Sequence, residues 1–133
     1  MSDIISEVKK LQLPLEKYSV VGGGALAARD IRKFGDIDLI VTDDLYQKMK
    51  NDGWEEREKR YPYFHLYKGN AEVAKNFSHI DGCMLDHERV IENSDIIEGI
   101  PFMSLPDLIK LKQAMGREKD LKDIELILNY MKK

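Results

Sequence analysis

Hydrophobic and polar positions change period several times along the chain, between the three-to-four-residue repeat of helices and the alternation of strands. Apolar side chains recur at helical spacing over residues 3–12 and 120–131, which predicts a helix near each end. Residues 96–103 are expected to be extended, and residues 78–93 show no pattern that decides between helix, strand and loop. We interpret five runs as strands (18–21, 36–41, 54–59, 63–67 and 71–77) and expect further helices after residues 24, 42 and 104.

Four residues mark where predicted helices begin or end. Thr42 and Ser104 each precede a helical stretch, and their hydroxyl groups can accept hydrogen bonds from the free N–H groups of the first turn. Asp120 is expected to cap the last helix in the same way, and Gly116 to end the helix before it. Because consecutive strands follow residue 53, the pattern predicts an α/β (α+β) protein and not a series of alternating βαβ units.

The composition restricts the class of protein. The chain has 133 residues, of which 43% are hydrophobic and 34% charged, as expected for one soluble globular domain over residues 1–133. Its formal net charge of −3 argues against an extended nucleic-acid surface, so phosphate binding has to be local. One cysteine, Cys83, cannot form an internal disulfide, and the amino terminus shows neither a signal peptide nor a lipidation signal. We therefore expect a cytoplasmic protein that does not enter a membrane.

Three consecutive glycines, Gly22, Gly23 and Gly24, lie where a predicted strand passes into a predicted helix. Without side chains, the backbone N–H groups at such a junction can approach a phosphate, and the start of a helix favours negative charge. Glycine-rich turns also serve ordinary chain reversal, so the glycines alone leave both interpretations open.

Two aspartates, Asp36 and Asp38, begin the next predicted strand. Residues two apart on a strand point to the same face, so the two carboxylates are expected to repel each other. A cation relieves that repulsion, and Mg²⁺ is the usual choice where oxygen ligands and substrate phosphates combine. The alternative is a pair of solvated aspartates at a frayed strand start.

The order of these features resembles the nucleotidyltransferase superfamily. The runs Val20–Ala27 and Gly35–Val41 are similar to its signature, in which a hydrophobic residue precedes Gly-Gly or Gly-Ser and a spacer of about one helix precedes Asp-x-Asp. Residues 105–127 resemble the closing helices of small bacterial and archaeal members. The resemblance implies a nucleotidyltransferase-like fold, with a mixed central sheet flanked by helices and with carboxyl-terminal helices.

The resemblance also implies roles for individual residues. Asp36 and Asp38 are expected to bind a divalent metal, Mg²⁺ or Mn²⁺. Gly22 and Gly23 are expected to approach the triphosphate, with Gly24 as an adjoining candidate. The family's motif commonly ends in Gly-Ser, whereas this chain has glycine throughout, which removes one hydroxyl contact to phosphate.

Superfamily members generally carry a third carboxylate on a later strand, which helps to bind metal and can activate the acceptor hydroxyl. Glu72 is the first choice because its neighbours are apolar and strand-like, and Asp81 is the alternative. Lys112 and Lys119 lie near the last two predicted helices and are candidates for nucleotide contacts. For each lysine, the competing interpretation is a solvated charge that pairs with nearby carboxylates.

The favoured function is metal-dependent transfer of a nucleoside monophosphate from an NTP, with ATP as the first choice, to an unidentified acceptor hydroxyl. A chain of this size leaves little room for an acceptor domain, so a second copy or a separate partner protein is expected to complete the site. One alternative is a non-catalytic nucleotide-binding or antitoxin-like protein of the same fold. A second is a dinucleotide-binding domain, since Gly22, Gly24 and Ala27 also match its glycine pattern.

Overall fold

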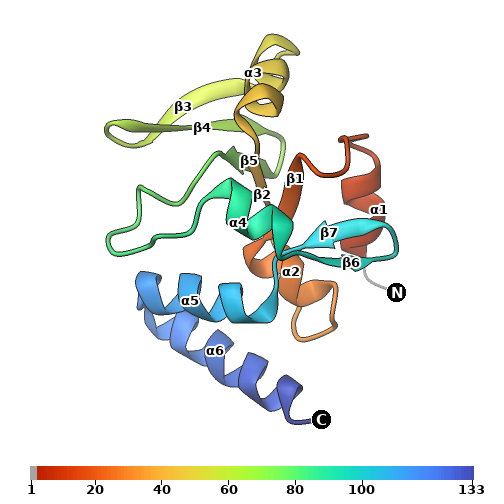
Figure 1. Ribbon diagram of the computed structural model, residues 1–133, viewed down its shortest axis with the longest axis vertical. Coiled ribbons are helices and arrows are strands. Elements are labelled where there is room, and N and C mark those ends of the chain that lie inside the picture. Colours follow the sequence, from red (N-terminus) through yellow and green to blue (C-terminus); the bar gives the residue numbers. More distant parts are fainter. Residues whose placement is uncertain (1–2) are drawn as a thin grey trace.

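Over residues 3–133, which the computed structural model describes, seven strands form one mixed sheet with six helices around it (Figure 1). The strands are β1 (Tyr18–Val21), β2 (Ile37–Val41), β3 (Glu55–Arg60), β4 (Tyr63–Lys68), β5 (Ala71–Ala74), β6 (Asp95–Ile97) and β7 (Ile100–Phe102). The helices are α1 (Asp3–Lys9), α2 (Gly22–Ala27), α3 (Asp43–Asn51), α4 (His87–Glu92), α5 (Leu105–Met115) and α6 (Glu118–Met131). The predicted mixed sheet, flanking helices and carboxyl-terminal helices are confirmed.

The strand order is β3-β4-β5-β2-β1-β7-β6. Strand β2 lies between an antiparallel neighbour, β1, and a parallel neighbour, β5. The register places Asp38 opposite Val21 on one side and opposite Glu72 on the other. A dinucleotide-binding domain requires a parallel βαβ unit after the glycine motif, whereas β1 and β2 run antiparallel. The fold therefore contradicts the dinucleotide-binding alternative.

The centre of the sheet carries the core. All four residues of β1 are buried, and so are four of the five residues of β2, every one except Asp38. Helices α2 and α4 both contact these two strands, while α5 and α6 lie side by side at one end of the molecule (Figure 1). The partly buried acid Asp38 therefore interrupts an otherwise apolar central strand.

Most predicted boundaries agree with the structure. The hydroxyl oxygens of Thr42 and Ser104 accept hydrogen bonds from the first turns of α3 and α5, and Gly116 ends α5 in the left-handed conformation. Two strands are shorter than expected, because β2 begins after Asp36 and β5 ends at Ala74. The undecided region 78–93 contains a loop followed by α4.

The start of the last helix was predicted wrongly. Helix α6 begins at Glu118 with Arg117 as its cap residue, and Asp120 lies inside the first turn with its side chain buried. Its carboxylate accepts hydrogen bonds from the backbone N–H and the guanidinium of Arg117. Of the apolar face expected for this helix, Ile127 is buried, whereas Leu121, Leu128 and Met131 are exposed. Buried ion pairs thus replace part of the expected apolar contact.

Within residues 3–133, none of the helices combines the length and the apolar composition that crossing a membrane requires.

Replacing Gly24 by alanine is expected to destabilise the fold. A Cβ atom there would lie 2.9 Å from Cγ1 of Val20 and 3.1 Å from Cδ1 of Ile4, both in the core. Val20 is β-branched and fully buried, so it has little freedom to yield. Gly24→Ala should lower the free energy of unfolding by about 1–3 kcal/mol in urea denaturation. Gly35→Ala is the matched control, because its Cβ would meet no atom within 4 Å; equal stability of the two variants would contradict this account.

Candidate active site

The junction between β1 and α2 brings the backbone close to an acidic side chain. Gly22 has a φ of +62°, and a Cβ there would lie 3.3 Å from Oδ2 of Asp38. A Cβ on Gly23 would lie 3.4 Å from Nη1 of Arg32. Gly22 is therefore needed both for its conformation and for the close approach to Asp38.

Two carboxylates stand side by side on neighbouring strands. Asp38 on β2 is the register partner of Glu72 on β5, and the two strands are parallel. Asp36, two residues before Asp38, lies just outside the strand and is exposed. The fold thus brings Glu72 together with the predicted Asp-x-Asp pair.

The crowding of negative charge changes the titration of Asp38. Burial raises the pKa of Asp38 most, the carboxylates of Glu72 and Asp36 raise it further, and the result is a pKa of about 6. The ammonium groups of Lys59 and Lys112 lower the pKa of Asp38 and only partly offset these effects. The site therefore favours a proton or a cation beside Asp38.

Glu72 is held from three directions. His65 Nδ1 lies 2.6 Å, Lys59 Nζ 3.1 Å and the Tyr67 hydroxyl 3.2 Å from one oxygen of this carboxylate, Oε2. An ionised carboxylate only accepts hydrogen bonds, so His65 Nδ1 carries the donated proton. The His65 hydrogen bond lowers the pKa of Glu72 most, burial opposes it, and Lys59 lowers it further, to about 2. Glu72 is therefore ionised at neutral pH.

These groups line one cavity of about 290 Å³, near the lower end of the range for ligand pockets. Gly22, Gly23, Asp36, Asp38 and Glu72 form one part of its wall, and Lys112 and Lys119 contribute another. Asp81 and Gly24 are not among the lining residues: Gly24 packs in the core, and Asp81 is exposed and pairs with Arg60 at 3.1 Å. Apolar side chains complete the wall, namely Leu39, Phe77, Ile80, Leu111 and Met115.

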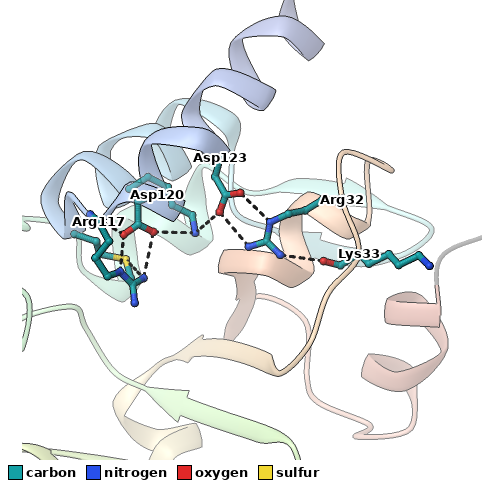
Figure 2. Close-up of polar contacts among 7 residues, drawn as sticks. Arg32, Lys33, Arg117, Asp120 and Asp123 are labelled. Atoms are coloured by element: carbon teal, nitrogen blue, oxygen red, sulfur yellow. Dashed lines mark hydrogen bonds and ion pairs between the residues drawn. The ribbon is translucent and has the colours of Figure 1, made fainter.

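The basic part of the wall is tied to α6. The Lys112 ammonium is buried 3.4 Å from Asp120 Oδ1 and 3.0 Å from Asp123 Oδ2. Arg32 makes two hydrogen bonds to Asp123, at 2.9 and 3.1 Å, and Arg117 pairs with Asp120 (Figure 2). Figure 2 shows these hydrogen bonds and ion pairs as one connected network, which runs from Arg117 through Asp120 and Asp123 to Arg32, in the segment after α2. Because Lys112 is already paired twice, its first role is to fix α5 on α6 beside the cavity.

The fold can be compared with known proteins. No family model matches the sequence, and no curated protein matches it significantly. Among solved structures, the chain is similar to the aminoglycoside nucleotidyltransferase ANT(2″)-Ia in complex with adenylyl-2″-tobramycin, with a TM-score of 0.52 and 16% identity over 97% of this chain and 86% of that one. It is also similar to the Megavirus polyadenylate synthase, with a TM-score of 0.52 and 13% identity over 96% of this chain and 30% of that one.

The chain has the nucleotidyltransferase fold. The fold that the resemblance implied is thus confirmed by two solved structures. In this chain, Gly22 and Gly23 follow the end of β1, and Asp38 and Glu72 lie near the starts of β2 and β5. All four residues line the cavity.

The carboxylates of the cavity suit a metal ion that binds together with the substrate phosphates. They do not form a complete metal site by themselves. Among residues 3–133, no three His, Cys, Asp or Glu side chains are gathered in a geometry that could hold a metal ion. Mg²⁺ commonly needs only one or two carboxylates when substrate phosphates and water supply the other oxygens. Asp36 and Asp38 suit that chemistry, and the raised pKa of Asp38 shows that a positive charge there would be favourable. The three partners of Glu72, Lys59, His65 and Tyr67, all contact its Oε2 oxygen.

The sequence did not point to three residues of the cavity wall: Lys59, His65 and Arg32. His65 and Tyr67 alternate on β4, and the antiparallel register places Tyr67 opposite Glu72, so strand alternation could have indicated both. His79 stacks edge-on against His65 with ring centroids 4.7 Å apart, and its Nδ1 is buried without a hydrogen-bond partner. Burial lowers the pKa of His79 most, and the charge of His65 adds to this, giving about 4, so the ring is neutral at pH 7.

Removing the charge of Asp38 is expected to stabilise the protein at neutral pH. The folded protein holds this proton up to about pH 6, whereas the ordinary pKa is 3.8, so ionised Asp38 costs stability increasingly as the pH rises through that interval. Without divalent metal, Asp38→Asn should raise the free energy of unfolding by about 1–3 kcal/mol at neutral pH and have little effect near pH 4. Urea denaturation in EDTA measures both values. Asp81→Asn is the control, and an Asp38→Asn protein no more stable than the native one at neutral pH would contradict the electrostatic account.

Proposed function

We propose that this protein transfers a nucleoside monophosphate from an NTP to an acceptor hydroxyl, with Mg²⁺ or Mn²⁺. The single observation that carries the proposal is the pairing of Asp38 and Glu72 across adjacent parallel strands, beside Gly22, where a Cβ would lie only 3.3 Å from Oδ2 of Asp38. The nucleotidyltransferase fold supports the class of reaction. The cavity combines carboxylates with lysines, as a site for a metal-bound polyanion requires.

Each part of the site has a role in the proposed reaction. Asp36 and Asp38 would hold the metal, which neutralises phosphate charge and so makes the α-phosphorus a better electrophile. Gly22 and Gly23 allow the triphosphate to approach the backbone, and Lys119, exposed at the cavity wall, is available to contact it. The acceptor oxygen forms a bond to the α-phosphorus and its proton passes to solvent, while the bond from the α-phosphorus to the α,β-bridging oxygen breaks and pyrophosphate leaves.

The role of Glu72 follows from its surroundings. A general base works best with a pKa near the working pH, and the pKa of Glu72 is about 2. Glu72 is therefore better suited to remain ionised as a third metal ligand than to take the acceptor proton. His65 and Tyr67 would hold it in position for that role.

The identity of nucleotide and acceptor belongs to the proposal as well. ANT(2″)-Ia was solved with adenylyl-2″-tobramycin, an adenylylated small molecule, which supports ATP as the first nucleotide to test and a hydroxyl as the acceptor. The exposed apolar side chains of α6, including Leu121, Leu128 and Met131, offer contact area for a second copy of the chain or a separate partner. Such a surface would complete the acceptor side of a small domain.

Turnover should depend on Asp38. With ATP, Mg²⁺ and a panel of hydroxyl acceptors, pyrophosphate release by Asp38→Ala should fall at least about a hundredfold below that of the native protein, because the metal loses a principal ligand. Asp81→Ala is the matched control, since Asp81 is exposed and outside the cavity, and it should retain native activity. Equal activity of Asp38→Ala and the native protein would rule out the proposed site.

A non-catalytic nucleotide-binding protein is the second candidate. It is favoured by one observation: Lys59, His65 and Tyr67 all contact Glu72, so the third carboxylate is engaged. This candidate predicts saturable binding of ATP with Mg²⁺ but no pyrophosphate release with any acceptor. Calorimetric binding measured beside the pyrophosphate assay separates the two functions, and turnover that requires Asp38 would eliminate the second.

A further inference from the structure

Lys59 occupies an unusual position on the edge strand β3. The register between β3 and β4 shifts between Glu58, which faces Phe64, and Arg60, which faces Tyr63, so Lys59 is the extra residue of a bulge. Bulges often redirect a side chain beside a functional site. Here Lys59 lines the cavity, and its Nζ lies 3.1 Å from Oε2 of Glu72.

The other cations deep in the cavity wall are less free to change partners. Lys112, Arg32 and Arg117 pair with buried carboxylates of α6, and breaking those pairs would leave buried charges unpaired. Lys59 is different, because its partner Glu72 has a side chain that is 23% exposed, whereas those of Asp120 and Asp123 are 0% and 8% exposed. Its partner, Glu72, also keeps two other hydrogen-bond donors if Lys59 moves away.

An incoming triphosphate meets three carboxylates on one part of the cavity wall. Asp36, Asp38 and Glu72 all line the cavity, and Asp38 and Glu72 are register partners on adjacent strands. A polyanion binds there only if nearby cations turn toward it. The ammonium of Lys59 lies 3.1 Å from Glu72 Oε2 and on the wall of the same cavity as Asp38, so it lies within electrostatic reach of the centre of the site.

We propose that Lys59 is a phosphate-binding residue for a nucleoside triphosphate, and that Glu72 competes with the triphosphate for its ammonium group. This inference rests on the proposed function of the cavity. In the free protein, Lys59 neutralises Glu72; when the nucleotide binds, Lys59 moves to a phosphate oxygen. Glu72 then remains positioned by His65 and Tyr67, with the contact to Lys59 released. Nucleotide binding and the release of the third carboxylate are thereby coupled.

A double-mutant cycle tests this competition through ATP affinity in EDTA, measured by calorimetry at low ionic strength. Lys59→Met should weaken ATP binding by about 5- to 20-fold, because a charge-assisted contact is lost. Glu72→Gln should strengthen it by about 3- to 10-fold, because Lys59 is no longer held and one repulsive charge is removed. In the Lys59→Met background, Glu72→Gln should strengthen binding by less than about twofold, since only the loss of repulsion remains.

The controls identify each outcome. The Lys50–Glu56 pair, at 2.9 Å, is outside this cavity, and the matched variants Lys50→Met and Glu56→Gln should bind ATP as the native protein does. Lys59→Arg should restore most of the affinity, and thermal unfolding verifies that each variant is folded.

Native ATP affinity in Lys59→Met, or an equal effect of Glu72→Gln in both backgrounds, would overturn the competition between Glu72 and the triphosphate while leaving the proposed function intact. Failure of every protein, native included, to bind ATP with or without Mg²⁺ would overturn both.

Discussion

The burial of Asp38 beside Glu72 is the constraint around which the site is arranged. Two parallel strands in register pair these residues; burial raises the pKa of Asp38 most, and repulsion by the carboxylate of Glu72 raises it further. A folded protein ordinarily avoids such an arrangement, because it costs stability at neutral pH. Residues that destabilise the free protein in this way are typical of sites where a ligand supplies the missing charge.

The protein limits this cost with basic groups on two sides. Lys59 and His65 compensate Glu72 from the sheet edge, while Lys112 approaches from α5 and is fixed by Asp120 and Asp123. The latter contacts join α5 to α6, and the pair between Arg32 and Asp123 joins α6 to the segment after α2. The carboxyl-terminal helices thus have an electrostatic role in shaping the cavity in addition to their packing, which explains why α6 buries two acids beside Ile127.

The local features with a strong chemical signature could be predicted from the sequence. The caps Thr42 and Ser104 and the glycine-rich junction between strand and helix follow from residue type and spacing, and the apolar neighbours of Glu72 placed it on a strand. The mixed sheet followed from the resemblance to the nucleotidyltransferase superfamily. The partners of Glu72 could not be predicted, because they depend on the pairing of β3, β4 and β5 and on the bulge at Lys59. Asp120 was misassigned as a cap because its nearest cation, Arg117, draws it into a buried ion pair that local sequence does not reveal.

The most direct test of the central claim is a crystal structure with Mg²⁺ and a non-hydrolysable ATP analogue. The account predicts a metal ion bound by Asp36 and Asp38, with the phosphates against Gly22 and Gly23. A nucleotide bound elsewhere, or phosphates bound in this cavity without any metal contact to Asp38, would contradict it.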